Sequence, residues 1–179
     1  MKKYLIPFLI LLIVFFSIPP FYLMAQSQSI ELREPSVVYD LPYPGILPDH
    51  PLYIFKKTRD NVLVFATRDT MKKAQLYLLM SDKHIAMAAE LENKGKDSQA
   101  FEQLQEAEAL FAEIPPLLKT SKQQGVSATG DFMQTLFLSN AKHEQVITQV
   151  IKNITDLQVD EVNALLKLNK TSQENLRKI

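Results

Sequence analysis

The sequence predicts an all-α protein: an antiparallel bundle, or a set of hairpins, of four to five helices that follows an N-terminal signal or anchor segment. Three observations lead to this prediction. Apolar residues recur at helical spacing after residue 50, no alternating stretch is long enough for a strand, and the chain opens with a charged and then apolar segment. The 179 residues, less the opening segment, suit one domain that buries a core.

The N-terminus has the pattern of a targeting segment. Lys2 and Lys3 precede a long apolar run that ends near Pro19 and Pro20. Residues 1–25 are therefore either a signal peptide that is cleaved after Ala25 or an uncleaved membrane anchor. As an anchor, residues 4–25 could cross a hydrocarbon core of about 30 Å, with the lysines inside and the C-terminal domain outside. Both alternatives predict an extracytoplasmic domain, and the second adds membrane contact through residues 4–25.

Residues 26–49 predict a linker that ends in a stiff turn. The segment is first polar and then rich in proline, with Pro42, Pro44 and Pro48 near its end. Each proline restricts its own φ and disfavours helix in the residue before it. The linker is therefore expected to be extended and to lead into a helical domain over residues 50–170.

The first helix is expected over residues 51–66. Asp49 or His50 is placed to cap it, and a proline is tolerated in the first turn because its missing N–H has no helical partner there. Its apolar residues fall on one face: Leu52, Phe55, Val62 and Phe65. The stiff turn is expected to act as a rigid joint between the linker and this helix. Structural roles in it are predicted for Pro48, Asp49, Pro51, Leu52 and Tyr53.

Two longer helices are expected next. The second begins at Thr67 or Asp69 and runs to about residue 93, where Gly95 stands as a C-cap. The third begins at Asp97 or Ser98, and a pair of prolines at 115–116 ends or kinks it. Its apolar residues alternate in steps of four and three, as in antiparallel helix packing: Ala100, Leu104, Ala107, Phe111 and Ile114.

The remainder predicts a loop and two further helices. Residues 121–130 contain two glycines and several hydroxyl side chains, so a loop is expected there. A fourth helix is expected over residues 131–157 and a short fifth over residues 160–169. The polar residues 171–179 are expected to form a flexible tail.

Composition argues against several functions. Lys and Arg together number 20, as do Asp and Glu, so no global charge attracts nucleic acid. Cysteine is absent, which excludes disulfides, thiolate metal sites and cysteine nucleophiles. No paired-carboxylate or serine-hydrolase motif is visible, and the acidic pair Glu106 and Glu108 is expected to lie on solvated faces. We therefore predict no catalytic residues, no cofactor and no enzyme activity.

The three histidines do not predict a metal site. His50, His84 and His143 lack a second ligand-type residue at the spacing that places two ligands on one helix face. Asp82 and His84 are two residues apart and so point to different faces. Solvated or locally hydrogen-bonded histidines are expected.

Asn140 and His143 interrupt the apolar stripe of the fourth helix. One interpretation makes them a buried polar pair that fixes helix register or binds something. The other rotates the stripe through Ala141, so that both side chains reach solvent. The pattern alone favours the second interpretation.

A basic patch lies on the first helix and just after it: Lys56, Lys57, Arg59, Arg68, Lys72 and Lys73. In a domain close to its anchor it could contact anionic lipid headgroups. An ordinary exposed helix face is the simpler interpretation, and it is the one we favour here.

Two stretches resemble a known family. They are YPGILPDHPLYIFKKTRDNV and the following DTMKKAQLYLLMSDKHIAMAAELENKGK. The chain is similar to domain of unknown function family 5667 over about residues 41–169. The matching residues are Pro44, Gly45, Leu47, Pro48, Pro51, Leu52, Tyr53, Lys73, Ala74, Leu76, Leu78, His84, Ala86, Ala89 and Gly95. The resemblance implies an exported or membrane-attached bacterial helical module with no established activity.

The sequence thus predicts a noncatalytic extracytoplasmic helical module. Its expected partner is an unknown envelope protein or a second copy of itself, and not nucleic acid. The alternative is a small ligand-binding or metal-binding protein in which folding brings His84, His143 and carboxylates together. An envelope-acting hydrolase has the least support.

Overall fold

The computed structural model describes residues 37–154 and 159–179. The predicted signal or anchor at 1–25, the first part of the predicted linker at 26–36 and the predicted helix end at 155–157 lie outside these residues. Within the part that is described, no helix is both long and apolar enough to cross a membrane.

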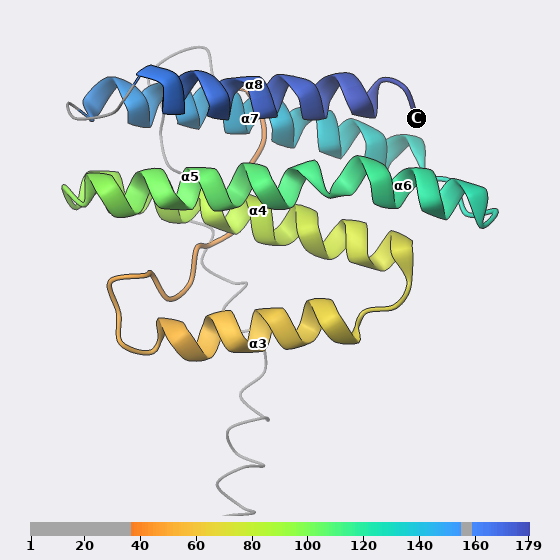
Figure 1. The fold of residues 1–179 in the computed structure, drawn as a ribbon, viewed down its shortest axis with the longest axis horizontal. Helices are drawn as coiled ribbons and strands as arrows, with labels where there is room; N and C mark the ends of the chain where they lie inside the picture. Colours follow the sequence, from red (N-terminus) through yellow and green to blue (C-terminus); the bar gives the residue numbers. More distant parts are fainter. Residues whose placement is uncertain (1–36, 155–158) are drawn as a thin grey trace, which may run out of the picture.

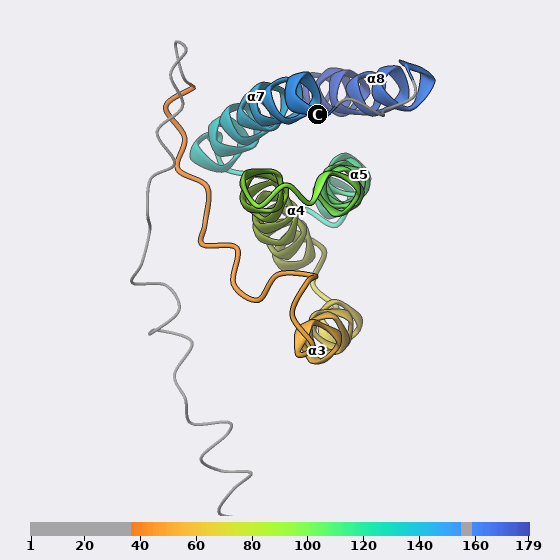
Figure 2. The same cartoon turned by 90° about the vertical axis from the view of Figure 1, so that its left-hand side faces the viewer.

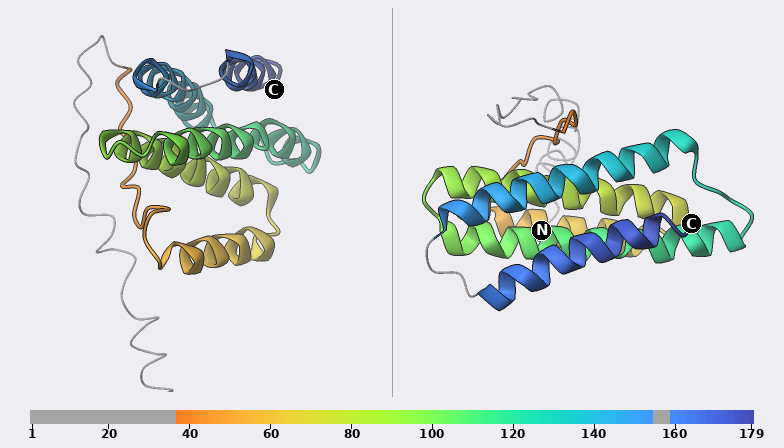
Figure 3. Two further views of the ribbon diagram at one scale, coloured as in Figure 1. Left: turned by 60° about the vertical axis from the view of Figure 1, so that its left-hand side comes forward. Right: turned by 90° about the horizontal axis from the view of Figure 1, so that it is seen from above.

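The described chain is all-helical, as predicted. Its elements are α3 (Tyr53–Ala66), α4 (Thr70–Asn93), α5 (Asp97–Ala112), α6 (Ile114–Gln123), α7 (Gly130–Asn153) and α8 (Val159–Leu176). They form three layers: α7 with α8, then α4 with α5 and α6, and finally α3 (Figures 1 and 2). A third direction shows the same order, with α4 and α5 between α3 and the α7–α8 pair (Figure 3).

Helices α4 and α5 form the central hairpin. The Asp69 side chain caps α4 by accepting from the Lys72 N–H at 2.8 Å. Gly95 then ends α4 with φ +67°, a conformation that glycine adopts without a Cβ penalty. The N–H of Lys96 donates back to the Leu91 carbonyl at 2.9 Å, which completes the glycine cap and turns the chain toward α5.

The proline pair does not end the helical run. Helix α5 stops at Ala112 and α6 starts at Ile114, so Pro115 and Pro116 occupy the first turn of α6. Prolines are tolerated there because those N–H groups have no helical acceptor. The two helices follow nearly one line (Figure 1) and, counted as one bent helix, leave five helices in the described chain.

Helices α7 and α8 cover the central hairpin. Thr129 caps α7 by accepting from the Phe132 N–H at 3.3 Å. The prediction of a short fifth helix with a flexible tail is wrong, because α8 continues to Leu176. Ser172 and Leu176 are buried there, and Leu176 joins the core beside α6 and α7. Contact with the bundle stabilises a segment whose local sequence is polar.

The core has two parts along the bundle. One lies between α4, α5, α7 and α8 and is built from Ile85, Leu91, Leu104, Val146, Ile147 and Leu165 among others. The second lies at the α6 end and includes Leu78, Phe111, Ile114, Leu118, Leu136 and Leu176. Phe132 and Phe137 are partly buried and pack against this second part. The apolar residues of α4 to α8 therefore converge within one chain.

Helix α3 does not share this core. Its apolar residues do fall on one face, as predicted, but that face is exposed: Leu52, Ile54, Phe55, Val62, Leu63 and Phe65. The side of α3 that faces the bundle instead carries the buried Lys56 and the partly buried Tyr53, Asp60 and Val64. The apolar stripe thus predicted the helix correctly, but the stripe faces solvent and not the bundle.

The proline-rich segment forms successive turns that lead into α3. The Leu47 carbonyl accepts from the N–H of His50 at 3.0 Å, and the His50 carbonyl accepts from Tyr53 at 2.9 Å. The His50 side chain caps the second turn by accepting from the Leu52 N–H at 3.1 Å. Asp49 does not cap; its carboxylate pairs with Lys96 at 2.8 Å and so ties the turn to the α4–α5 corner.

Candidate functional site: the buried network around His143

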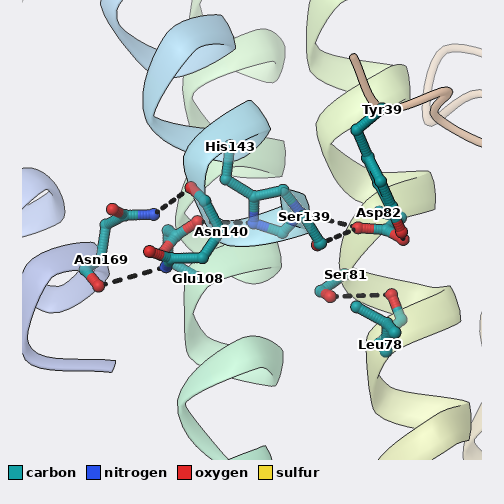
Figure 4. A network of polar contacts seen from close by, with 9 residues as sticks. All are labelled: Tyr39, Leu78, Ser81, Asp82, Glu108, Ser139, Asn140, His143 and Asn169. Atoms are coloured by element: carbon teal, nitrogen blue, oxygen red, sulfur yellow. Dashed lines mark hydrogen bonds and ion pairs between the residues drawn. The ribbon is translucent and has the colours of Figure 1, made fainter. Parts of the chain in front are cut away.

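His143 lies at the centre of a polar network inside the bundle (Figure 4). Its side chain is on α7 and is fully buried. Nδ1 lies 2.8 Å from Glu108 Oε1 on α5, and Nε2 lies 2.9 Å from Asp82 Oδ1 on α4. One imidazole ring therefore joins three helices.

The two carboxylates decide the charge of His143. Burial lowers its pKa, because an imidazolium loses hydration inside the protein. The hydrogen bonds and negative charges of Asp82 and Glu108 outweigh burial and raise the pKa of His143 to about 9. The ring is therefore a cation at neutral pH, and each nitrogen donates to one carboxylate.

Both carboxylate oxygens of Asp82 accept hydrogen bonds. Ser139 on α7 donates to its Oδ1 at 2.6 Å, and the hydroxyl of Tyr39 donates to its Oδ2 at 2.5 Å. Burial and the neighbouring Asp82 charge raise the pKa of Tyr39, so the phenol stays protonated and remains a donor. Through Tyr39, the linker segment before α3 is fastened to the bundle interior.

A second polar pair joins α7 to α8. Asn140 Nδ2 donates to the Asn169 carbonyl, and Asn169 Nδ2 donates to the Asn140 carbonyl, both at 3.2 Å. Both residues are buried. Because each amide needs the opposite backbone at one position, the pair fixes the register between the two helices.

The network does not have the geometry of a hydrolase. Ser139, His143 and Glu108 lie in the order of a serine–histidine–carboxylate triad, with Ser139 Oγ 3.3 Å from His143 Nε2. However, all three side chains are fully buried. An imidazolium has no lone pair to accept the serine proton, and Ser139 donates to Asp82 instead. In this arrangement the three side chains join α4, α5 and α7 through hydrogen bonds inside the core.

A shallow cavity lies beside the network without opening it. It has a volume of about 280 Å³ and is lined by Tyr39, Asp40, Pro42, Gln75, Leu78, Leu79, Asp82 and Phe132. Tyr39 and Asp82 are the network members that line it, and the Asp82 carboxylate already accepts from Tyr39 and Ser139. The cavity therefore offers a ligand no free charged group from the network.

His84 belongs to a different contact. Its Nδ1 lies 2.7 Å from Gln103 Oε1, and its Nε2 lies 3.8 Å from Glu106. Burial lowers the pKa of His84. His84 and His143 thus have separate partners, and across residues 37–154 and 159–179 no group of three or more His, Asp or Glu side chains is placed to hold a metal ion.

The polar side of α3 forms a joint with the bundle. Lys56 Nζ donates to the carbonyls of Pro44 and Ile46 at 3.0 and 3.2 Å and to the sulfur of Met87 at 3.1 Å. Burial lowers the pKa of Lys56 to about 8. Tyr53 adds a hydrogen bond to Gln103 at 3.4 Å, and Lys57 pairs with Glu106 at 2.8 Å. Lys56 is therefore no part of an exposed basic patch.

Sequence reasoning missed this network in two places. Asn140 and His143 are both fully buried, so the favoured interpretation, that they reach solvent, is wrong. Glu108 is also fully buried, against the expectation of a solvated face, because it lies on the core side of α5 near Leu104 and Phe111. One signal in the sequence indicates the network. A basic residue and two acidic residues each occupy a core position of a different helix: His143, Asp82 and Glu108.

Comparison with protein families settles the classification. The family model described as a domain of unknown function, DUF5667, matches residues 45–175, which is most of the chain. The chain belongs to the DUF5667 family. The match begins in the proline-rich turn and spans α3 to α7 and nearly all of α8. The resemblance of the proline turn and α4 led us to expect this. No curated protein and no solved structure matched this DUF5667 chain.

Proposed function

We propose that this DUF5667 chain is a noncatalytic, extracytoplasmic helical module of the cell envelope and that α3 is the element that binds its partner. The sequence of the N-terminus supports the location. Lys2 and Lys3 followed by a long apolar run are typical of a signal or anchor that sends the following domain across a membrane.

The exposed apolar face of α3 is the observation that carries the proposal. Ile54, Phe55 and Phe65 are 67%, 69% and 87% exposed, while Tyr53 and Lys56 on the other side of the same helix bond to Gln103 and Met87 of the bundle. Single exposed apolar residues are ordinary, but several on one helix face form a patch that favours contact with a partner. The domain therefore presents a binding element that its own core does not use.

The closed network supports a noncatalytic role. Ser139, His143 and Glu108 are the side chains that come nearest to a catalytic arrangement, and each is fully buried with a structural partner. Their contacts join α4, α5 and α7. We assign them to the stability of the module that carries α3.

The alternative function, a small ligand-binding or metal-binding protein, requires His84 and His143 to converge. His84 contacts Gln103 near α3, whereas His143 contacts Asp82 and Glu108 within the bundle. The two histidines have separate partners, so the structure gives this alternative no support. We therefore propose the interaction module.

Export and attachment can be tested on the whole chain in bacterial cells. We expect the protein in the envelope fraction, and we expect protease added outside the cytoplasmic membrane to digest the helical domain. Mass measurement then distinguishes a chain that retains residue 1 from one cleaved after Ala25. A domain that stays in the cytoplasm and resists external protease would contradict the proposal.

A further inference from the structure

We infer that the exposed face of α3 binds the surface of an anionic lipid bilayer, with the helix lying along the membrane and its apolar side chains at the boundary between headgroups and acyl chains. This inference rests on the proposed function, because an exported domain tethered at its N-terminus works close to a membrane. It names lipid as the partner of α3.

The shape of the face suits a flat apolar surface. We define the α3 face as Leu52, Ile54, Phe55, Val62, Leu63 and Phe65, all of which are exposed. Helix α3 has 14 residues and is therefore about 21 Å long. It is too short to span a hydrocarbon core of about 30 Å, but an amphipathic helix of this length can lie in the interface.

The position of α3 in the fold leaves this face accessible. Helix α3 forms an outer layer of the described chain, on the far side of α4 and α5 from α7 and α8 (Figures 1 and 2). The buried Lys56 and the Tyr53–Gln103 bond hold its opposite side against the domain. A bilayer could therefore meet the α3 face without disturbing the bundle.

The charge around α3 specifies an anionic surface. The whole chain is balanced, with 20 basic and 20 acidic residues. Residues 51–73 differ, because they contain six basic and two acidic residues. Arg59, Arg68 and Lys72 are exposed on α3 or shortly after it, and Arg59 pairs with its neighbour Asp60. Lys57 is also exposed, but it pairs with Glu106 of the bundle. Basic side chains that flank an apolar helix face are typical of helices that bind anionic membranes.

The same charges disfavour a second copy of this chain as the occupant. A two-fold contact centred on α3 would bring Arg59, at the middle of the helix, near Arg59 of the other copy. Like charges at an interface oppose association, whereas phosphate headgroups would neutralise them. A lipid surface therefore satisfies both the apolar and the charged part of the face.

A tether would keep the domain near the membrane. If residues 4–25 anchor the chain, the segment from Ala25 to Val37 connects the anchor to the described domain. An extended chain spans at most about 3.6 Å per residue, so a segment of this length bridges no more than roughly 40 Å. The domain would therefore stay within reach of the bilayer.

The test uses matched threonines in a chain that has no cysteine. Thr58→Cys places a label among the α3 face residues, and Thr171→Cys places the same label on α8; both positions are exposed. The full chain is reconstituted in vesicles of phosphatidylcholine, with or without phosphatidylglycerol, that contain a headgroup-attached quencher. We expect the label at position 58 to be quenched several-fold more than that at position 171, and more strongly in the phosphatidylglycerol vesicles.

Three outcomes would overturn the inference. Equal weak quenching at positions 58 and 171 means that α3 does not contact lipid. Equal quenching of position 58 in both lipids removes the anionic preference. A label at position 58 that enters an apolar environment without lipid quenching, and that forms excimers with a second labelled chain, identifies another copy as the partner.

A second variant separates lipid contact from the choice of label site. Phe65→Ser in the Thr58→Cys chain removes a large residue of the α3 face that is 87% exposed, so the fold is retained. We expect quenching at position 58 to fall toward the value at position 171. Failure of this experiment leaves export intact, because fractionation in cells reports export independently of what α3 contacts.

Discussion

Two of the buried basic side chains, His143 and Lys56, are accommodated in opposite ways. His143 lies between the carboxylates of Asp82 and Glu108, and its pKa rises to about 9. Lys56 donates to two backbone carbonyls and a thioether, and burial lowers its pKa to about 8. Asp60 raises the pKa of Lys56 only in part, and Lys83 and Arg59 lower it further.

The difference shows what holds each region in place. At His143, formal charges of opposite sign compensate for lost hydration, and the imidazolium becomes part of the core. At Lys56, carbonyl dipoles satisfy the N–H donors but do not balance the charge. We therefore expect the bundle to depend strongly on its cation, and α3 to be held by a weaker joint of polar contacts.

Replacing the cation of the bundle gives the largest expected effect. His143→Gln leaves Asp82 and Glu108 buried without a positive partner, and breaking a buried charge network in this way costs about 3–5 kcal/mol. Urea unfolding followed by circular dichroism measures this loss of stability.

His50→Gln is the matched control, because His50 is exposed beside the joint and its loss should cost less than about 1 kcal/mol. Equal stability of the two variants would mean that the network contributes no more than a surface turn does.

The pH dependence of stability gives the next largest effect. The folded-state pKa of His143, about 9, lies above its ordinary value of 6.5, so its stabilisation is complete below pH 6.5 and is lost as pH rises through 9. The loss over that window is about 3 kcal/mol. Denaturant midpoints from pH 6 to pH 9.5 measure it.

Lys56 opposes this trend, since its lowered pKa favours the folded state at higher pH. The His143→Gln chain should therefore lose the decline with pH. A decline of the same size in that variant would assign the effect to another group.

Replacing the cation of the joint gives a smaller and local effect. Lys56→Met keeps the length and apolar contact of the side chain but removes its donors to Pro44 and Ile46. We expect a loss of about 1 kcal/mol in global stability, as for ordinary hydrogen bonds, together with faster cleavage near α3. Limited proteolysis with mass mapping measures this.

Lys57→Met is the control, because Lys57 is exposed and forms a surface ion pair. If the Lys56→Met chain were cleaved near α3 no faster than the control, the joint would not depend on Lys56.

The α3 face gives the smallest effect on folding. Phe65→Ser should change stability by less than about 0.5 kcal/mol, because the side chain already contacts solvent. Leu104→Ser, at a fully buried position, provides the contrast and should destabilise the bundle strongly. Thermal unfolding of the two variants tests this. A large loss from Phe65→Ser would mean that α3 contributes to the core after all.

The sequence predicted the helices well, because their caps and apolar spacing are local signals. Asp69 and Gly95 mark the ends of α4 as expected. The end of α8 was not predicted, since the burial of Leu176 depends on α6 and α7, which are distant in sequence. The orientation of α3 was missed for a related reason. An apolar stripe indicates that a helix face prefers to leave water and does not identify the surface that receives it.

The network was harder to predict than the fold. A single polar residue in an apolar stripe is either buried or turned toward solvent. The pattern within one helix does not distinguish these for Asp82, Glu108 or His143. Their complementary charges become informative only when α4, α5 and α7 are brought together, over separations of 35 and 61 residues. One basic and two acidic residues at apolar positions of three different helices are the feature of the sequence that indicates a buried charge network.

The attachment of Tyr39 also determines how the domain bears a mechanical load. Tension applied from the N-terminal side enters the described chain at Val37 and reaches the Tyr39–Asp82 bond before it reaches α3. Detachment of the segment that contains Tyr39 would remove one hydrogen-bond donor from Asp82 and admit water beside His143. The contacts of Val37 with Gln145 and of Tyr39 with Asp82 are therefore the first to bear the tension, and their loss would expose the charged interior of the bundle.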